Sequence, residues 1–183
     1  MKKTIFFASA TIISLICSQS FADTYKYVPY IGVAYTRATA RADTAKPEYN
    51  IGSLYIGSEY GKYFGTEIFY GQSSYKKNYI ADVKTRTSYR AYGLDLAAYL
   101  PLGCDNRFDL VAAVGAGEYV FAKKIAGEKH HNDSGWGYRF GGGLKYHLDD
   151  NWQIKTLARY VKFNDISDFD RQSEYSIAAE YHF

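Results

Sequence analysis

The sequence predicts an all-β fold in one domain, an eight-stranded antiparallel up-and-down β-barrel. Three observations lead to this prediction. Tyr, Phe and Trp make up 18% of the 183 residues, against ten Leu and one Met, and aromatic side chains favour strands over helices. Segments of about ten residues alternate apolar and polar side chains with period two. Their connections are alternately long and short, which puts all short turns at one end of the barrel.

The first 22 residues are expected to be a signal peptide and not part of the fold. Lys2 and Lys3 precede an apolar run, and small residues at Ser20 and Ala22 mark a cleavage point before residue 23. The run is shorter than the roughly 20 apolar residues of a membrane helix. We therefore expect an exported barrel domain of residues 23–183, which keeps only Cys104 and forms no internal disulfide.

The strands follow in order, each bounded by turn residues or by a polar connection. The expected strands are 27–36, 51–60, 64–75, 88–100, 107–120, 135–148, 152–163 and 173–183. Gly, Asp or Asn occurs in every short turn and supplies the backbone freedom or side-chain hydrogen bonds of a hairpin. These turns are 61–63, 101–106 and 149–151. The long connections are 37–50, 76–87, 121–134 and 164–172.

The face that points inward decides between a water-soluble barrel and a membrane barrel, because period-two alternation is the same in both. In 135–148, one face carries large apolar residues from Trp136 to Leu148, and the other carries Gly, Arg139 and Lys145. The polar faces mix isolated charges with small residues, which suits the narrow lumen of a transmembrane barrel. For 27–36 and 107–120, the sequence does not decide which face points inward.

Aromatic residues also gather toward the ends of the apolar faces. They are Trp136, Trp152, Tyr60, Phe64, Tyr181 and Phe183. Rings at strand ends are typical of the aromatic girdles that lie at headgroup depth in transmembrane β-barrels. The prediction is therefore a barrel in the bacterial outer membrane, and the alternative is a soluble exported barrel with these rings in its core.

The polar faces should bring acidic and basic side chains into one lumen. A buried charge without a partner costs several kcal/mol, so we expect these groups to pair and to plug the barrel. The expected ion-pair network consists of Glu67, Asp95, Arg139, Lys145, Lys155, Arg159 and Glu180. A catalytic or ion-translocating role for the same charges is the alternative.

Four segments carry a resemblance to a known family. They are FGTEI at 64–68, YLPLG at 99–103, GWGYRFGGGLKY at 135–146 and the terminal YHF. These segments resemble the porin-like, opacity-type outer-membrane β-barrels, relatives of the OmpA transmembrane domain. The resemblance implies periplasmic short turns and surface-exposed long loops. It also implies a C-terminal signal for the outer-membrane assembly machinery, formed by Tyr175, Ile177, Ala179, Tyr181 and Phe183.

The long connections are where such a chain can meet a partner, because the wall faces lipid and the lumen is filled. Connection 76–87 has a net charge of +3, a candidate surface for lipopolysaccharide or a host polyanion, or merely a solvated loop. Its basic residues are Lys76, Lys77, Lys84 and Arg86. We expect a non-enzymatic, monomeric adhesin or envelope-integrity protein that contacts outer-membrane lipid and host surface molecules. The formal charge of only +3 gives no reason to expect a nucleic-acid partner.

Two other functions are weighed, a small-solute porin and a rim-located lipid-modifying enzyme. Eight strands leave room for side chains and not for a water column, which argues against the porin. The candidate enzyme residues are His130, His131, Asp165, Asp168 and Asp170. They show no triad pattern, no third metal ligand at suitable spacing, and neither the Gly nor the distal Glu of a calcium loop. We therefore expect no catalytic residue, metal or cofactor, and hydrogen-bonded structural roles for His147 and His182.

Overall fold

The structure is a computed structural model that describes residues 27–41, 47–74, 76–80, 83–103, 107–125, 131–164, 166 and 169–183. It describes the backbone alone for 76–80, 83–87, 123–125 and 131–132. The expected signal peptide and Cys104 lie outside the described residues. Within those residues, no helix is long and apolar enough to cross a membrane.

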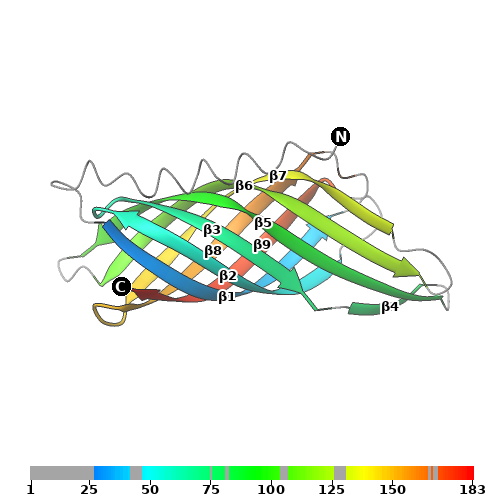
Figure 1. Cartoon of the computed structure of the whole chain (residues 1–183), viewed down its shortest axis with the longest axis horizontal. Helices are drawn as coiled ribbons and strands as arrows, with labels where there is room; N and C mark the ends of the chain where they lie inside the picture. Colours follow the sequence, from blue (N-terminus) through cyan, green and yellow to red (C-terminus); the bar gives the residue numbers. More distant parts are fainter. Residues whose placement is uncertain are drawn as a thin grey trace.

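The described residues form a closed, all-antiparallel β-barrel whose strands run obliquely around its long axis (Figure 1). The strands are β1 (Tyr27–Arg41), β2 (Glu48–Tyr60), β3 (Phe64–Ser73), β4 (Lys76–Ile80), β5 (Val83–Leu102), β6 (Phe108–Ile125), β7 (His131–His147), β8 (Trp152–Phe163) and β9 (Arg171–His182). Strands that are neighbours in sequence pair, except β3 with β4; β1 pairs with β9, and β3 pairs with β5, which closes the sheet. Because β3 and β4 lie successively along β5, they make one barrel strand, and the predicted eight-stranded up-and-down topology is confirmed.

Most strands are longer than the sequence indicated, and the difference lies at one end of the barrel. Residues 76–80 and 83–87, expected to be a loop, form a β4–β5 hairpin, and β6 and β7 extend in the same direction. The expected connections 37–50, 121–134 and 164–172 are likewise shortened by β1, β2, β6, β7 and β9. These extensions were missed because outward positions such as Arg37 and Arg41 are polar, although inward residues such as Ala38 are buried. Only β8 has the expected bounds.

The two ends of the barrel differ in their connections. We call the end with the tight β2–β3, β5–β6 and β7–β8 connections, Tyr27 and Phe183 the short-turn end, and the opposite end the long-hairpin end. Gly61 and Gly103 adopt φ of 65° and 78° at the short-turn end, a conformation that favours Gly. In the β7–β8 turn, the Asp149 carboxylate accepts backbone N–H bonds from Asn151 at 2.9 Å and Trp152 at 2.7 Å. These bonds lower the pKa of the Asp149 carboxyl below its ordinary value.

The orientation of the faces is that of a membrane barrel. The charged residues Glu67 and Arg139 are 5% and 7% exposed, whereas Ile177 on the outer wall is 55% exposed. The sequence did not decide which face of β6 points inward. In the structure the inner face carries Val111 and Asp109, which are both buried. An apolar outer wall around a polar interior is the reverse of a soluble barrel, so the alternative of a soluble exported barrel is wrong.

The core of the protein is its lumen, and much of it is aromatic. Tyr89, Tyr119, Phe121 and Phe163 pack edge to face or tilted, with ring centroids 5.1 to 6.1 Å apart. Nearer the short-turn end, Tyr30 and Tyr55 reach over glycines of neighbouring strands, where an added Cβ would overlap their rings. The aromatic girdle predicted from the sequence lies on the outer wall, and these inward rings were not among the expected residues. They fill the narrow cylinder between the ion pairs.

Candidate functional site

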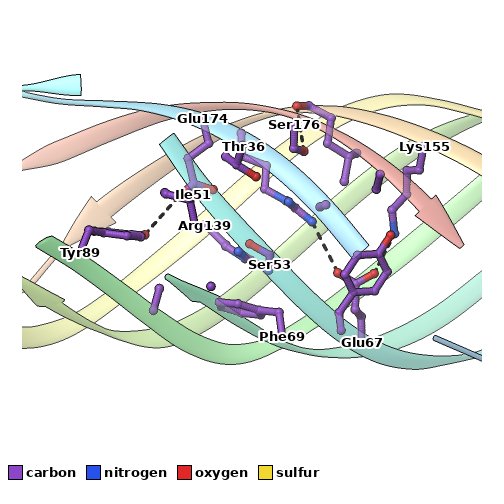
Figure 2. Close-up of a pocket in the computed structure, with 17 residues that line it drawn as sticks. Thr36, Ile51, Ser53, Glu67, Phe69, Tyr89, Arg139, Lys155, Glu174 and Ser176 are labelled. Carbon is purple, nitrogen blue, oxygen red and sulfur yellow. Dashed lines mark hydrogen bonds and ion pairs between the residues drawn. The ribbon is translucent and has the colours of Figure 1, made fainter. Parts of the chain in front are cut away.

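The centre of the lumen holds a pair of arginines on one carboxylate. Arg139 of β7 donates from Nε to Oδ1 of Asp95 at 2.6 Å, and its Nη2 pairs with Oδ2 of the same residue. Arg159 of β8 approaches that Oδ2 at 3.0 Å. The Arg139 guanidinium lies 3.3 Å from the centroid of the Phe69 ring, on the opposite wall (Figure 2). A planar cation held by a carboxylate and stacked on a ring is fixed in place.

A lysine links the second group of charges, nearer the short-turn end. Lys155 Nζ lies 2.7 Å from Oε2 of Glu67 and 2.5 Å from Oε1 of Glu180. Tyr30 donates its hydroxyl to Glu67 at 3.2 Å, and Tyr55 donates to Glu180 at 3.0 Å. All three ionised side chains are buried. Each carboxylate therefore has both a counter-charge and a hydroxyl donor, which offsets much of the cost of burying it.

A third group of charges lies at the short-turn end. Lys145 approaches Glu59 at 2.6 Å and Asp109 at 3.4 Å, and His147 Nε2 lies 2.8 Å from Asp109. Glu59 and Asp109 were not included in the expected network. The signal was present, because Glu59 lies four residues after the inward-facing Tyr55 and period two places both on the same face.

At the long-hairpin end of the lumen, Glu174 faces the aromatic cluster. It accepts hydrogen bonds from the Tyr89 hydroxyl at 3.3 Å and from Gln172 Nε2 at 2.7 Å. The seven residues of the expected network thus all lie in the lumen, where they are joined by Glu59, Asp109 and Glu174. The structure brings them together in groups along the barrel axis.

Little space is left among these side chains. A cavity of about 30 Å³ lies between Thr36, Ser53, Phe69, Arg139 and Glu174 (Figure 2). That volume holds only one or a few water molecules. The lumen therefore resembles a packed protein core more than a channel.

The other candidate residues are described only in part. Lys76, Lys77, Lys84 and Arg86 lie on β4 and β5 and not on a loop, and their side chains are outside the described residues. His130, Asp165 and Asp168 lie wholly outside them, as does the side chain of His131. The backbone of Asp170 joins the ladder, with its N–H donating to the Arg41 carbonyl at 3.3 Å.

The residues of the expected assembly signal alternate along β9 on the outer wall. Tyr175, Ile177 and Phe183 are well exposed, and Ala179 and Tyr181 are half-exposed. Phe183 itself follows the last residue of β9, and its N–H donates to the Pro29 carbonyl at 3.1 Å.

A closed antiparallel barrel with an apolar outer wall and a polar interior is typical of outer-membrane β-barrels. Comparison with protein families identifies the chain more closely. The family described as "Outer membrane protein beta-barrel domain" matches residues 8–183, so the chain belongs to this family and is located in the bacterial outer membrane. This confirms the resemblance seen in the sequence. No sequence among the curated proteins matches the chain.

Solved structures share the fold at low sequence identity. Neisserial surface protein A is similar with a TM-score of 0.65 and 15% identity, over 85% of this chain and 97% of that one. Ail, the attachment invasion locus protein of Yersinia pestis, has a TM-score of 0.59 and 17% identity, over 86% and 97%. A second structure of Ail, in complex with the heparin analogue sucrose octasulfate, has a TM-score of 0.59 and 16% identity, over 87% and 99%.

Proposed function

We propose that this barrel is a non-enzymatic surface protein whose long-hairpin end faces outward and binds anionic saccharides through a basic row on β4, β5 and β6. The observation that carries the proposal is the register of these strands. Lys77 of β4 is paired with Arg86 of β5, which is paired with Lys124 of β6. Three basic positions therefore form one line across three adjacent strands.

A row of like charges on adjacent strands is unfavourable by itself, and it favours binding of an anionic partner. Like charges at directly opposed positions of a sheet repel each other, typically by a few tenths of a kcal/mol for each pair. A phosphate or sulfate group between them would relieve the repulsion and form charge-assisted hydrogen bonds. Among the proteins of similar fold, Ail forms a complex with the heparin analogue sucrose octasulfate. Lipopolysaccharide phosphates and sulfated host glycans share this chemistry.

The filled lumen supports a role in binding over one in transport. Paired charges and aromatic rings occupy the interior, and the cavity of about 30 Å³ is far smaller than a solute. In a planar bilayer, the folded protein should give no stable openings of porin size. Such openings would show instead that the plug moves aside and would favour a small-solute porin. For the enzyme alternative, outer-membrane lipids incubated with the folded protein should keep their acylation unchanged.

The experiment that tests the binding proposal compares two double variants. Lys77→Gln with Arg86→Gln removes two charges of the basic row. Lys62→Gln with Arg107→Gln removes the same two residue types from exposed positions near the short-turn end. Folded protein in detergent is titrated with heparin and, separately, with lipopolysaccharide.

The row variant should lose about 2 kcal/mol of binding free energy, or roughly 30-fold in affinity, at about 1 kcal/mol for each cation. Its binding should also become less sensitive to salt. The control variant should bind like the original protein. If the row variant loses affinity for only one of the two polyanions, that polyanion represents the partner. If both variants bind both polyanions with equal affinity, the basic row is not a binding surface.

A further inference from the structure

Among the described side chains, the charged groups that meet in the lumen do not balance. Its ion pairs and hydrogen bonds described above involve six carboxylates and four cations, so a formal excess of two negative charges is left while the histidines are neutral. Around the arginines, Asp95 and Glu174 are matched by Arg139 and Arg159. The excess lies toward the short-turn end, although Arg159 also reaches Glu67 at 3.8 Å. There, Lys145 and Lys155 face the four carboxylates of Glu59, Glu67, Asp109 and Glu180.

Unpartnered polar atoms lie in the same part of the lumen. Glu180 is fully buried and uses Oε1 for both Lys155 and Tyr55, which leaves its Oε2 without a hydrogen bond. His182 is 3% exposed, and its Nε2 also has no hydrogen-bond partner. These two atoms lie 3.6 Å apart. A buried polar atom without a partner costs free energy, so an arrangement that leaves two facing each other calls for an explanation.

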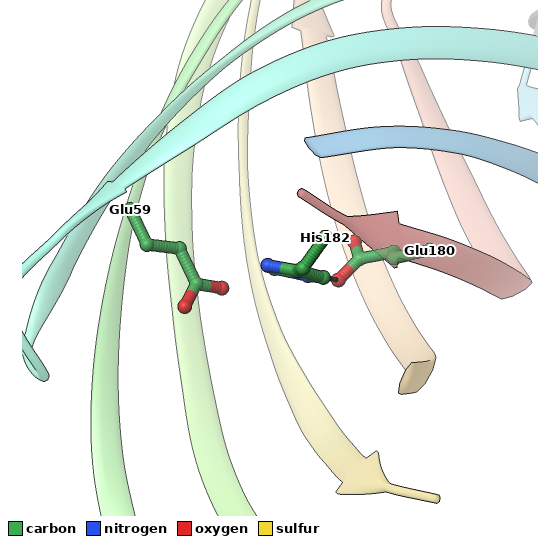
Figure 3. A group of neighbouring side chains, drawn as sticks. All are labelled: Glu59, Glu180 and His182. Atoms are coloured by element: carbon green, nitrogen blue, oxygen red, sulfur yellow. Dashed lines mark ion pairs between the residues drawn. The ribbon is translucent and has the colours of Figure 1, made fainter. Parts of the chain in front are cut away.

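Glu59 completes the group from β2, which lies on the other side of β1 from β9. One ligand atom from each of Glu59, Glu180 and His182 lies within 4.8 Å of the other two, and the three side chains converge (Figure 3). The imidazole is held in place, since it stacks on Tyr30 with ring centroids 4.8 Å apart. Its backbone is fixed too, by an N–H bond to the Asn151 carbonyl at 2.8 Å and a bond from Asn151 Nδ2 at 2.9 Å.

We infer that Glu59, Glu180 and His182 form a binding site for a divalent transition cation of the Zn²⁺ type at the short-turn end of the lumen. One imidazole nitrogen and two carboxylate oxygens are ligands that suit Zn²⁺, whereas Mg²⁺ and Ca²⁺ prefer oxygen alone. The two positive charges of the cation match the local excess of negative charge.

The geometry needs only a small adjustment. With bonds of about 2.0 Å, the ligands of a tetrahedral Zn²⁺ lie about 3.3 Å apart, so the three atoms must close by at most about 1.5 Å. Glu59 can supply that movement, because its side chain is 14% exposed at the mouth of the barrel and Glu180 is not exposed. Its Oε1 is engaged by Lys145, which leaves the other oxygen for a cation. A water molecule would take the fourth position.

The sequence analysis expected a structural role for His182 and no metal. No spacing motif could have indicated the site, since Glu59 and Glu180 come from β2 and β9 and meet only when the barrel closes.

The test uses untagged, folded protein in detergent, freed of metal with a chelator. Zn²⁺ is added, and bound metal is measured by equilibrium dialysis and elemental analysis. We expect one Zn²⁺ per chain and a higher thermal unfolding midpoint when it is bound. Co²⁺ substituted at the site should give the visible absorption of a four-coordinate centre. An excess of Mg²⁺ or Ca²⁺ should not displace the bound Zn²⁺.

Two variants and one control identify the ligands. His182→Gln and Glu59→Gln should each lower Zn²⁺ affinity at least tenfold, on the order of the loss of one ligand. The control is His147→Gln, at the same end of the lumen but paired with Asp109, and it should bind as the original protein does. Heat-modifiable gel mobility checks that each variant is folded. If His182→Gln does not fold, the Zn²⁺ affinity of Glu59→Gln alone tests the site. Failure to bind Zn²⁺, or an equal loss in the His147 control, would overturn the inference.

Discussion

Replacing Lys155 by Met tests whether the plug of the lumen stabilises the barrel. Lys155 is the cation that Glu67 and Glu180 share, at 2.7 and 2.5 Å. Met has a similar length and no charge, so the substitution leaves the packing nearly unchanged and removes the counter-charge of two buried carboxylates. The perturbation is therefore electrostatic.

The expected magnitude follows from the burial of the three groups. Removing one partner of a buried ion pair typically costs 3–5 kcal/mol, and here two carboxylates lose their nearest cation at once, while Glu67 keeps Arg159 at 3.8 Å. We expect a loss near the upper end, about 5 kcal/mol. With a denaturant dependence of about 2 kcal/mol per molar urea, the unfolding midpoint falls by about 2.5 M.

The assay is equilibrium unfolding of the folded protein in lipid vesicles, followed by Trp fluorescence. The matched control is Lys162→Met on the same strand, where the side chain is exposed and the change should stay within about 0.5 kcal/mol. Adding Glu180→Gln to Lys155→Met should restore part of the stability, because it removes one of the unpaired charges. If Lys155→Met unfolds at the same midpoint as Lys162→Met, the lumen charges do not hold the barrel together.

Three further predictions concern a close approach, the chain end and a turn. Gly115→Ala should destabilise by about 1–3 kcal/mol in the same unfolding assay, because the new Cβ would lie 2.5 Å from the Leu94 carbonyl oxygen. Gly52→Ala, with nothing within 4 Å of its Cβ, should be neutral or slightly stabilising. Deleting Phe183 should lower the amount of heat-modifiable barrel in the outer membrane if it belongs to the assembly signal, and an unchanged amount would exclude that role. The pKa of the Asp149 carboxyl is lowered in the folded state, so this group stabilises the fold above its unfolded-state pKa, and that stabilisation is lost as the pH falls through its folded-state pKa. An NMR titration that gives an ordinary carboxyl pKa for Asp149 would contradict the hydrogen bonds of this turn.

The sequence predicted the barrel and, except in 27–36 and 107–120, which face of a strand points inward, because both follow from local alternation. In β7, for example, Arg139 and Tyr138 are assigned to opposite faces by their positions alone, and the structure places them so. The bounds of β8 were also correct, since Asp149 and Asn151 mark its start by turn chemistry. Strand ends at the long-hairpin end were not predictable in this way, because pairing there continues past the apolar outer wall, where outward positions such as Arg37 and Arg41 are polar.

Partners across the lumen were beyond sequence analysis for a different reason. Period two places Glu59 and His182 on inner faces, but which groups meet depends on the register and shear of a closed cylinder. The inward Tyr rings were missed on similar grounds. Tyr55 and Tyr175 are the same residue type and have the same β-propensity, yet Tyr55 is 4% exposed and Tyr175 is 65% exposed. Only the phase of the strand separates them.

The β4–β5 hairpin leaves part of the sheet without a neighbour. Among the described residues, β4 pairs with β5 alone, so no described strand pairs with its other border. Exposed borders of this kind attract further strands and lead to aggregation unless charged residues guard them. Lys76 and Lys77 stand at the start of β4, and their positive charges would repel an identical hairpin from a second barrel. The same lysines can thus keep neighbouring molecules apart in a crowded membrane while leaving the border free for a partner of opposite charge.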